Sequence, residues 1–269
     1  MSKIRLTVIG GGQMGRALVG GMLAGKVISA ADLLVVEPDS SSRAWWDEHH
    51  HDVAVTEDLG QAVADSDVIL LAVKPHIVQG VLTSLPKACD HKLIISIAAG
   101  VSLEKLSAWC GHRRVIRVMP NTPSLVGQGA SAYCGTGDVT EDDFRLIDSM
   151  LSSVGSAHRV SDSQMDAVTA LSGSGPAYVC MMIEALADGG VLEGLPRPLA
   201  MQLATQTVLG TAKMIQQTGK HPGELKDAVS SPGGTTIAAI ASLEQNGLRG
   251  ALIDAVKQAA HRSRELGSS

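Results

Sequence analysis

A glycine-rich turn near the N-terminus, directly after an apolar segment, constrains the fold of this chain more than any other feature. Residues 4–10 are largely apolar, and Gly10-Gly11-Gly12-Gln13-Met14-Gly15 lead from them into a predicted helix over residues 16–24. This G-x-G-x-x-G pattern between a strand and a helix is typical of dinucleotide-binding turns. Its glycines allow a tight turn, a close approach to a pyrophosphate and close contact between helix and strand. The N-terminus of the helix offers free N–H groups to the phosphates.

Strand-like and helix-like segments alternate through the first half of the chain. Short apolar runs, as expected of strands covered on both faces, occupy residues 33–37, 67–73, 92–97, 115–118 and 130–134. Because strands that alternate with helices form parallel sheets, we expect an α/β Rossmann-type domain over residues 1–160.

The second half of the chain has a different character. After about Ser161 no segment is a convincing strand, and proline and glycine bracket predicted helices at residues 177–188, 198–217, 224–229, 235–245 and 251–265. The first of these is expected to end at Gly189-Gly190. The sequence therefore predicts an all-α C-terminal domain over residues 161–269.

Composition and charge argue against several classes of partner. With 22 basic and 27 acidic residues, the net charge is −5 and no basic stripe indicates nucleic acid. No purely apolar stretch reaches the length of a membrane span, and no cleavable apolar segment precedes the first strand, so we expect a cytoplasmic protein. Four cysteines without CxxC spacing and the run His49–His51 do not form a metal motif.

Residues that follow the predicted strands are candidates for the cofactor site, because loops at the carboxyl ends of parallel strands line the ligand crevice. Glu37 lies 22 residues after Gly15, where an acidic side chain binds a ribose 2′-hydroxyl and favours NAD. Ser40–Arg43 follow at once, and hydroxyls with an arginine could instead hold the 2′-phosphate of NADP. The cofactor preference stays open at this point.

Three further loops lie at the same predicted edge of the sheet. Lys74-Pro75-His76 follow the third strand, Ala98-Ala99-Gly100 the fourth, and Asn121-Thr122 stand between two prolines after the fifth. The last loop is either a stiff wall of a nicotinamide pocket or a plain structural turn.

Two segments of the helical half, residues 172–176 and 230–236, are predicted to be loops that lead into helix N-termini. The second combines backbone N–H groups with the hydroxyls of Thr235 and Thr236, which suits a small carboxylate. Ordinary capping of a helix is the alternative.

Taken together, these motifs resemble the pyrroline-5-carboxylate reductase family over nearly the whole chain. The resemblance is carried by VIGGGQMG near the start, LAVKPH at 71–76, SIAAGVSLEKL at 96–106, RVIRVMPNTP at 114–123, DAVTALSGSGPAY at 166–178 and HPGELKDAVSSPGGTTIAAI at 221–240. It implies an enzyme that reduces L-1-pyrroline-5-carboxylate to L-proline with NADPH or NADH, the last step of proline biosynthesis. It also implies a homodimer with decamers as a higher assembly, and an active site at the subunit interface.

The resemblance assigns roles to individual residues. It implies cofactor contacts for the glycine turn and for the residues after the strands, namely Ile9, Gly10, Gly11, Gly12, Gln13, Met14, Gly15, Glu37, Ala72, Val73, Lys74, Pro75, Ala98, Ala99 and Asn121. It implies a substrate site at Ser231, Gly233, Gly234, Thr235 and Thr236. Ser231 through Thr235 would hold the carboxylate, largely through main chain, and Thr236 would be the catalytic residue that binds the ring nitrogen. Two departures stand out: Glu37 stands where some relatives have a small hydroxyl residue, and Ala228 replaces a polar asparagine or a bulkier apolar residue seen elsewhere.

The chemistry agrees with an imine substrate. Reduction of a ketone needs a proton donor for the alkoxide, yet no lysine lies between Lys105 and Lys213 to serve on the interdomain helix. A protonated imine is already a cation that hydride neutralises, so orientation by a neutral hydroxyl suffices. A reductase for another cyclic imino acid and a non-catalytic dinucleotide sensor remain as rivals.

Overall fold

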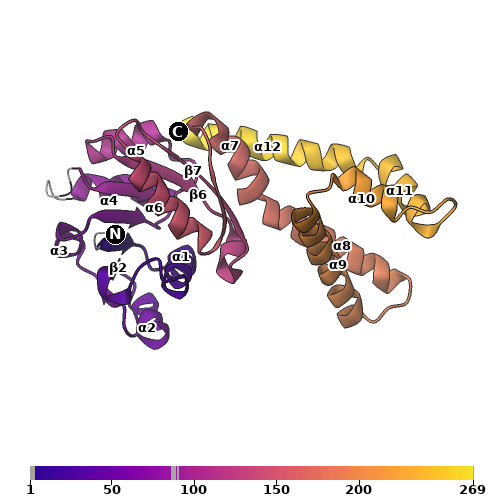
Figure 1. Cartoon of the computed structure of the whole chain (residues 1–269), viewed down its shortest axis with the longest axis horizontal. Helices are drawn as coiled ribbons and strands as arrows, with labels where there is room; N and C mark the ends of the chain where they lie inside the picture. Colours follow the sequence, from indigo (N-terminus) through magenta and orange to yellow (C-terminus); the bar gives the residue numbers. More distant parts are fainter. Residues whose placement is uncertain (1–3, 86–88, 90, 269) are drawn as a thin grey trace. The chain divides into compact units, whose positions relative to one another are not determined.

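The chain folds as two compact units (Figure 1). A computed structural model describes residues 4–85, 89 and 91–268. The first unit runs to Ser174 and includes the chain from Ala259 onward, and the second comprises residues 175–258. The domain boundary after residue 160 stays a prediction, since the compact units are defined by contacts alone.

The first unit is built on one eight-stranded sheet with the order β3-β2-β1-β4-β5-β6-β7-β8. Its strands are β1 Leu6–Ile9, β2 Leu33–Val36, β3 Ala54–Thr56, β4 Val68–Leu71, β5 Leu93–Ser96, β6 Val115–Met119, β7 Gly129–Gly135 and β8 Gly155–Arg159. All six strands predicted from apolar runs are present. Strands β3 and β8 were not predicted, because both lie at the edges of the sheet and lack a buried apolar run.

The sheet is mainly parallel, but the expectation of a wholly parallel sheet was wrong at one pair. Strand β7 runs antiparallel to β6, with Val118 opposite Tyr133. The physical reason is the connection, because residues 120–128 hold only a short 3₁₀ turn over Thr122–Val126 and cannot form the long crossover that a parallel neighbour needs.

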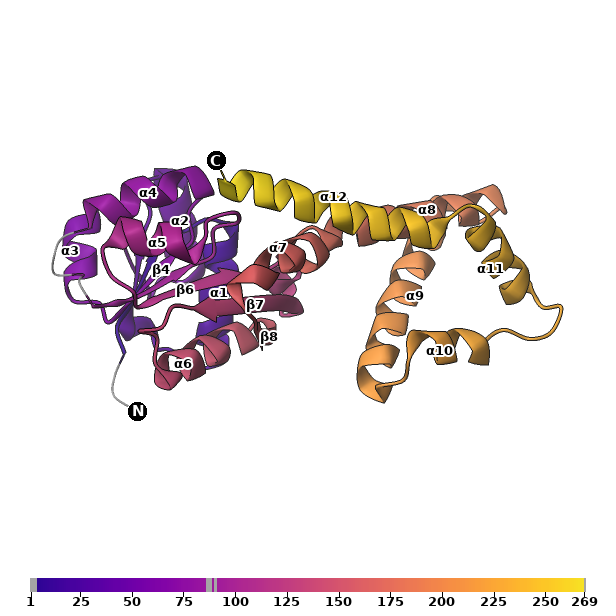
Figure 2. The same ribbon diagram turned by 90° about the horizontal axis from the view of Figure 1, so that it is seen from above.

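Two layers of helices cover the sheet, as Figure 2 shows for α4 and α5 on one side and α6 on the other. Successive residues of a strand point to opposite faces, so Val8 joins the core under α1 and α6 while Ile9 joins the core under α3, α4 and α5. The helices of this unit are α1 Gln13–Ala24, α2 Ser40–His49, α3 Leu59–Ala64, α4 Pro75–Ser84, α5 Leu103–Cys110, α6 Glu141–Ser152 and α7 Met165–Val168.

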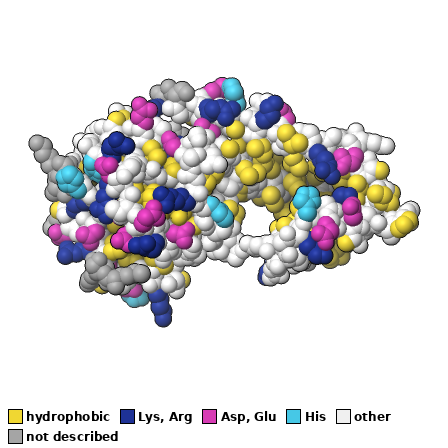
Figure 3. Space-filling view, turned by 45° about the horizontal axis from the view of Figure 1, so that its top comes forward, with side chains coloured by type: hydrophobic (Ala, Val, Ile, Leu, Met, Phe, Trp, Pro, Cys, Tyr) yellow, Lys and Arg dark blue, Asp and Glu magenta, His cyan; other side chains and the backbone are white. Residues whose placement is uncertain are grey.

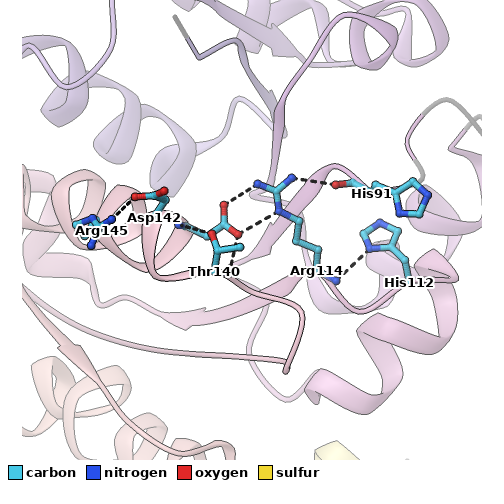
Figure 4. Close-up of polar contacts among 7 residues, drawn as sticks. His91, His112, Arg114, Thr140, Asp142 and Arg145 are labelled. Carbon is cyan, nitrogen blue, oxygen red and sulfur yellow. Dashed lines mark hydrogen bonds and ion pairs between the residues drawn. The ribbon is translucent and has the colours of Figure 1, made fainter. Parts of the chain in front are cut away.

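Helix α6 is tied to Arg114, the residue before β6, by a partly buried ion pair, drawn in Figure 4. Thr140 and Asp143 form a reciprocal capping box at the start of the helix. Arg114 donates to the same Asp143 carboxylate from two nitrogens, at 3.1 and 2.7 Å. The neighbouring pair of Asp142 and Arg145 lies at the exposed surface instead.

The second unit is helical. It contains α8 Gly175–Leu192, α9 Arg197–Thr218, α10 Pro222–Ala228, α11 Thr235–Gln245 and the first part of α12 Leu248–Ser268. No strand follows residue 160 in the described part of the chain, as predicted. The end of α12 belongs to the first unit, where the buried hydroxyl of Ser263 donates to Asp166 at 2.6 Å.

The expected end of a helix at Gly189-Gly190 was wrong. Helix α8 continues through both glycines to Leu192, and it lies side by side with α9 (Figure 1). A side chain at Gly190 would stand 3.2 Å from the Cβ of Ala200. Gly190 therefore serves close contact between two helices rather than termination.

The expected loop at residues 172–176 was also wrong. Thr169–Gly173 form a wide π-helical turn that joins α7 to α8, and the Ser174 N–H donates to the Thr169 carbonyl at 2.8 Å. Such turns are rare, and sequence alone did not distinguish this one from a glycine-rich loop.

Large apolar side chains are exposed on the helical unit, and Figure 3 shows yellow side chains gathered there. More than half of the surface is exposed for several of them, including Met181, Leu192, Leu203, Leu209 and Ile253. An apolar surface of this kind marks an interaction face. None of the helices, over the residues described, is long and apolar enough to cross a membrane. The cytoplasmic location stays a prediction.

Candidate active site

The glycine turn lies where the order of the sheet reverses. From β1 the chain moves outward to β2 and β3, and then returns to place β4 on the other side of β1. The carboxyl ends of β1 and β4 therefore open a crevice, which is where open α/β sheets bind ligands. The Ala72 N–H donates to the Ile9 carbonyl at 2.8 Å and holds the two strand ends together.

Two glycines of the motif, Gly10 and Gly15, are required by the packing of the turn itself. Gly10 has a φ of 103°, and a Cβ there would stand 2.5 Å from the Ala72 carbonyl oxygen. A Cβ on Gly15 would stand 2.3 Å from the Gly10 oxygen. Around Gly12, in contrast, a Cβ would meet nothing within 4 Å. The turn is thus crowded on the protein side and open on the side that a pyrophosphate would approach.

The peptide groups around Gly11 are held from three directions. Its N–H donates to Glu37 Oε2 at 2.7 Å, and its carbonyl accepts from Trp46 Nε1 and Arg16 Nε, each at 3.0 Å. The Arg16 guanidinium also lies over the ring of Trp45, 4.1 Å from its centroid. Sequence reasoning did not find Arg16 or Trp46, because no motif links the glycine turn to the interior of α2.

The loop from β2 into α2 is rich in charge. Asp39 caps α2, accepting from the Ser41 hydroxyl and the Ser42 N–H. Hydrogen bonds from Ser41 and Ser42 lower the pKa of Asp39 below its usual value. Arg43 donates to the carbonyls of residues 37 and 38 and forms an ion pair with Glu57 at 2.9 Å.

The remaining predicted cofactor residues lie at the same edge of the sheet. Ala72 and Val73 follow β4, Lys74 is the N-cap of α4, and Pro75 is its first residue. The Lys74 side chain is exposed. Ala98 and Ala99 follow β5, with Ala98 buried and Ala99 exposed. All of these residues belong to the first unit, so the fold brings them together with Ile9–Gly15.

The Asn121 side chain connects two segments of this unit through hydrogen bonds. Its side-chain oxygen accepts from the Ala130 N–H at 2.8 Å, and its amide nitrogen donates to the Ser172 carbonyl at 3.1 Å. The residue is 8% exposed. It links the loop after β6 to the π-helical turn, and its predicted contact with cofactor stays a prediction.

The predicted substrate residues lie together in the second unit, at the start of α11. Gly233 has a φ of 67°, and Gly234 is the N-cap, so the helix begins at Thr235 without a capping side chain. A Cβ on Gly234 would stand 2.3 Å from the Ser231 hydroxyl. The first N–H groups of a helix have no partner within it, so this turn can bind a carboxylate. Ala228 ends α10, shortly before this turn.

Comparison with known proteins finds a profile match in each half of the chain and relatives that match its whole length. The profile described as "Pyrroline-5-carboxylate reductase dimerisation" matches residues 162–266, and "NADP oxidoreductase coenzyme F420-dependent" matches residues 5–100. A pyrroline-5-carboxylate reductase of Synechocystis is 47% identical over 264 residues, which cover 98% of each chain. The chain belongs to the pyrroline-5-carboxylate reductase family.

Solved structures of the family share the whole fold. The Coxiella burnetii enzyme aligns with a TM-score of 0.90 at 35% identity, covering 100% of each chain. The Plasmodium falciparum enzyme, solved with NADP bound, aligns with a TM-score of 0.88 at 34% identity, covering 99% of each chain. The family, the fold class and the class of NAD(P)H-dependent oxidoreductase predicted from the sequence are confirmed. The profile of the helical half also supports an oligomer.

Proposed function

We propose that this chain reduces L-1-pyrroline-5-carboxylate to L-proline with a nicotinamide dinucleotide. The observation that carries the proposal is the joint presence of two intact sites in one family member. One is the glycine turn at the switch point of the sheet, and the other is the uncapped N-terminus of α11. A sensor of dinucleotides would need the first site and not the second.

The glycine turn fits a dinucleotide on steric grounds. Gly12 leaves open space for a pyrophosphate, while Gly10 and Gly15 tolerate no side chain. Arg16 donates the first hydrogen bond within α1, to the Gly12 carbonyl, so the N–H groups before it have no partner in the helix and can bind phosphate. When bound, the reduced nicotinamide supplies a hydride to the imine carbon.

The second unit supplies orientation of the substrate. The main chain of Ser231 through Thr235 binds the carboxylate, and the hydroxyl of Thr236 accepts a hydrogen bond from the protonated ring nitrogen. The cationic imine becomes a neutral amine when it receives hydride, so a neutral hydroxyl is sufficient at this position. The absence of any lysine from residues 106–212 agrees with an imine rather than a ketone.

A homodimer is part of the proposal. The exposed apolar side chains of the helical unit offer the surface, and the family profile over residues 162–266 is one of dimerisation. Active sites at the subunit interface and assembly into decamers are implied by the resemblance alone. Sedimentation of the purified chain measures the assembly directly.

The test of the activity follows nicotinamide absorbance when purified, folded protein meets pyrroline-5-carboxylate, with identification of proline as the product. Oxidation of the cofactor with stoichiometric proline supports the proposal. A folded oligomer that binds dinucleotide and forms no proline contradicts it. Comparison with the six-membered cyclic imine distinguishes the rival reductase, which would prefer the larger ring.

A further inference from the structure

The end of β2 carries a fixed negative charge. Glu37 is 8% exposed, and its two carboxylate oxygens accept from the N–H groups of Gly11 and Asp39 at 2.7 and 2.9 Å. An acidic residue at this position faces the adenosine ribose of a bound dinucleotide. A carboxylate has about four lone-pair sites, so Glu37 keeps acceptor capacity for a ribose hydroxyl.

Arg43, the arginine at the start of α2, is already bound to protein groups. Arg43 donates from Nη1 to the carbonyls of Glu37 and Pro38, at 2.9 and 2.7 Å, and from Nη2 to Glu57 at 2.9 Å. Its guanidinium is thereby held on the backbone of the loop and neutralised by a carboxylate. A 2′-phosphate would have to compete with Glu57 for this arginine.

Two serines of the loop donate hydrogen bonds to the Asp39 carboxylate. Ser41 donates to Asp39 Oδ1 at 2.6 Å, and the Ser42 N–H donates to the same oxygen at 2.8 Å. Asp39 thus occupies the serine groups of the loop, while Glu57 is the ion-pair partner of Arg43. The interpretation of residues 40–43 as a ready site for a 2′-phosphate is not supported by these contacts.

We propose that Glu37 selects NADH over NADPH in this chain, with Glu57 reinforcing the selection by engaging Arg43. The proposal depends on the proposed function only for the class of ligand, a nicotinamide dinucleotide. The P. falciparum relative was solved with NADP bound, so the preference inferred here belongs to the β2–α2 loop of this chain and not to the family.

The test measures equilibrium binding of NADH and NADPH to the full-length protein by calorimetry, without imine substrate. We expect NADH to bind about 10- to 100-fold more tightly, because like charges brought together at a binding site discriminate strongly. In Glu37→Ser the ratio of the two affinities should fall at least tenfold, with tighter binding of NADPH. Glu57→Gln should strengthen NADPH binding by a smaller factor and leave NADH binding unchanged.

Two further variants distinguish selection between NADH and NADPH from a general loss of cofactor binding at the glycine turn. Glu48→Gln removes an acid on α2, the helix that carries Arg43, and the Glu48 side chain is 79% exposed. The ratio of NADH affinity to NADPH affinity should not change in this variant. Adding Arg43→Ala to Glu37→Ser should abolish the gain in NADPH affinity. Equal or tighter binding of NADPH by the natural chain, an equal loss of both cofactors in Glu37→Ser, or no binding of either would overturn the proposal. Selective NADH binding without proline formation would instead contradict only the proposed function.

Discussion

Arg114 binds Asp143 through two parallel hydrogen bonds, from Nε to Oδ2 at 3.1 Å and from Nη2 to Oδ1 at 2.7 Å. The Asp143 side chain is 6% exposed and also closes the capping box of α6 with Thr140. Burial raises the pKa of Asp143, but the hydrogen bonds from Arg114 and Thr140 outweigh it, and the pKa lies below its usual value. This one carboxylate therefore fixes both the start of α6 and its attachment to Arg114, which directly precedes β6.

Asp143→Asn is expected to lower the free energy of unfolding by about 2 kcal/mol, because it leaves a partly buried guanidinium without its charged partner. Since the folded-state pKa is depressed, the stabilisation is present above the unfolded pKa of about 3.9 and is lost as pH falls through the folded value. Urea unfolding from pH 7 down to pH 3 should thus show the two proteins converging in stability.

The matched control for this ion pair is Asp142→Asn on the same turn of α6. Its partner is Arg145, and the two side chains are 84% and 73% exposed. A surface pair contributes about 0–1 kcal/mol, so little change in unfolding is expected. An equal loss in both variants would contradict the distinction drawn between the two pairs.

Substitutions in the glycine turn should separate folding from cofactor binding. Gly10→Ala forces a left-handed residue to carry a Cβ against the Ala72 carbonyl, so a loss of about 3 kcal/mol in unfolding free energy is expected. Gly12→Ala meets open space, so stability should change by less than about 0.5 kcal/mol while dinucleotide affinity falls at least about tenfold. Thermal unfolding and calorimetric binding measure the two effects. A Gly12→Ala protein with natural affinity would be evidence against a pyrophosphate at this turn.

Asn121→Leu removes both hydrogen bonds of the carboxamide and leaves the Ala130 N–H without its acceptor. A loss of about 2 kcal/mol in stability is expected, since an unsatisfied buried group costs about 1–3 kcal/mol. The exposed neighbour Thr122 provides the control, because Thr122→Ala alters the same loop and leaves both hydrogen bonds of Asn121 in place. Urea unfolding compares the variants, and an unchanged midpoint for Asn121→Leu would contradict the structural role.

Thr236 is tested by two variants of similar size. Thr236→Val deletes the hydroxyl that would bind the ring nitrogen, so kcat should fall by about 10- to 100-fold, in line with the loss of one hydrogen bond to a charged group. Thr236→Ser keeps a hydroxyl and should retain most of the turnover. Binding of NADH without substrate should be the same in both. Full turnover by Thr236→Val would remove Thr236 from the mechanism.

Local patterns in the sequence predicted the elements that depend on local chemistry. The helix over Thr235–Gln245 has the predicted bounds, because a glycine cap and Asn246-Gly247 mark its ends within a few residues. The apolar strands were likewise predicted, since full burial demands continuous apolar runs. The edge strand β8, with the sequence GSAHR, carries no such signal and was missed.

Elements that depend on distant contacts escaped prediction for a common reason. Gly189-Gly190 looks like a helix end, yet Gly190 continues α8 because Ala200 of another helix lies against it. Trp46 looks like a core residue, and the chain gives no local sign that its indole N–H donates to Gly11, 35 residues earlier. In both cases a partner remote in sequence determines the role of the residue.

The sequence by itself determined the family, the two-part organisation and the residue sets around the glycine turn and α11, because these are written in contiguous motifs. Only the tertiary structure decided the direction of β7, the hydrogen bonds of Asn121 to Ala130 and Ser172, and the ion pair of Arg43 with Glu57. Those features arise where segments from different parts of the chain satisfy one another's hydrogen bonds and charges, and such pairings are fixed when the chain folds rather than by any one segment.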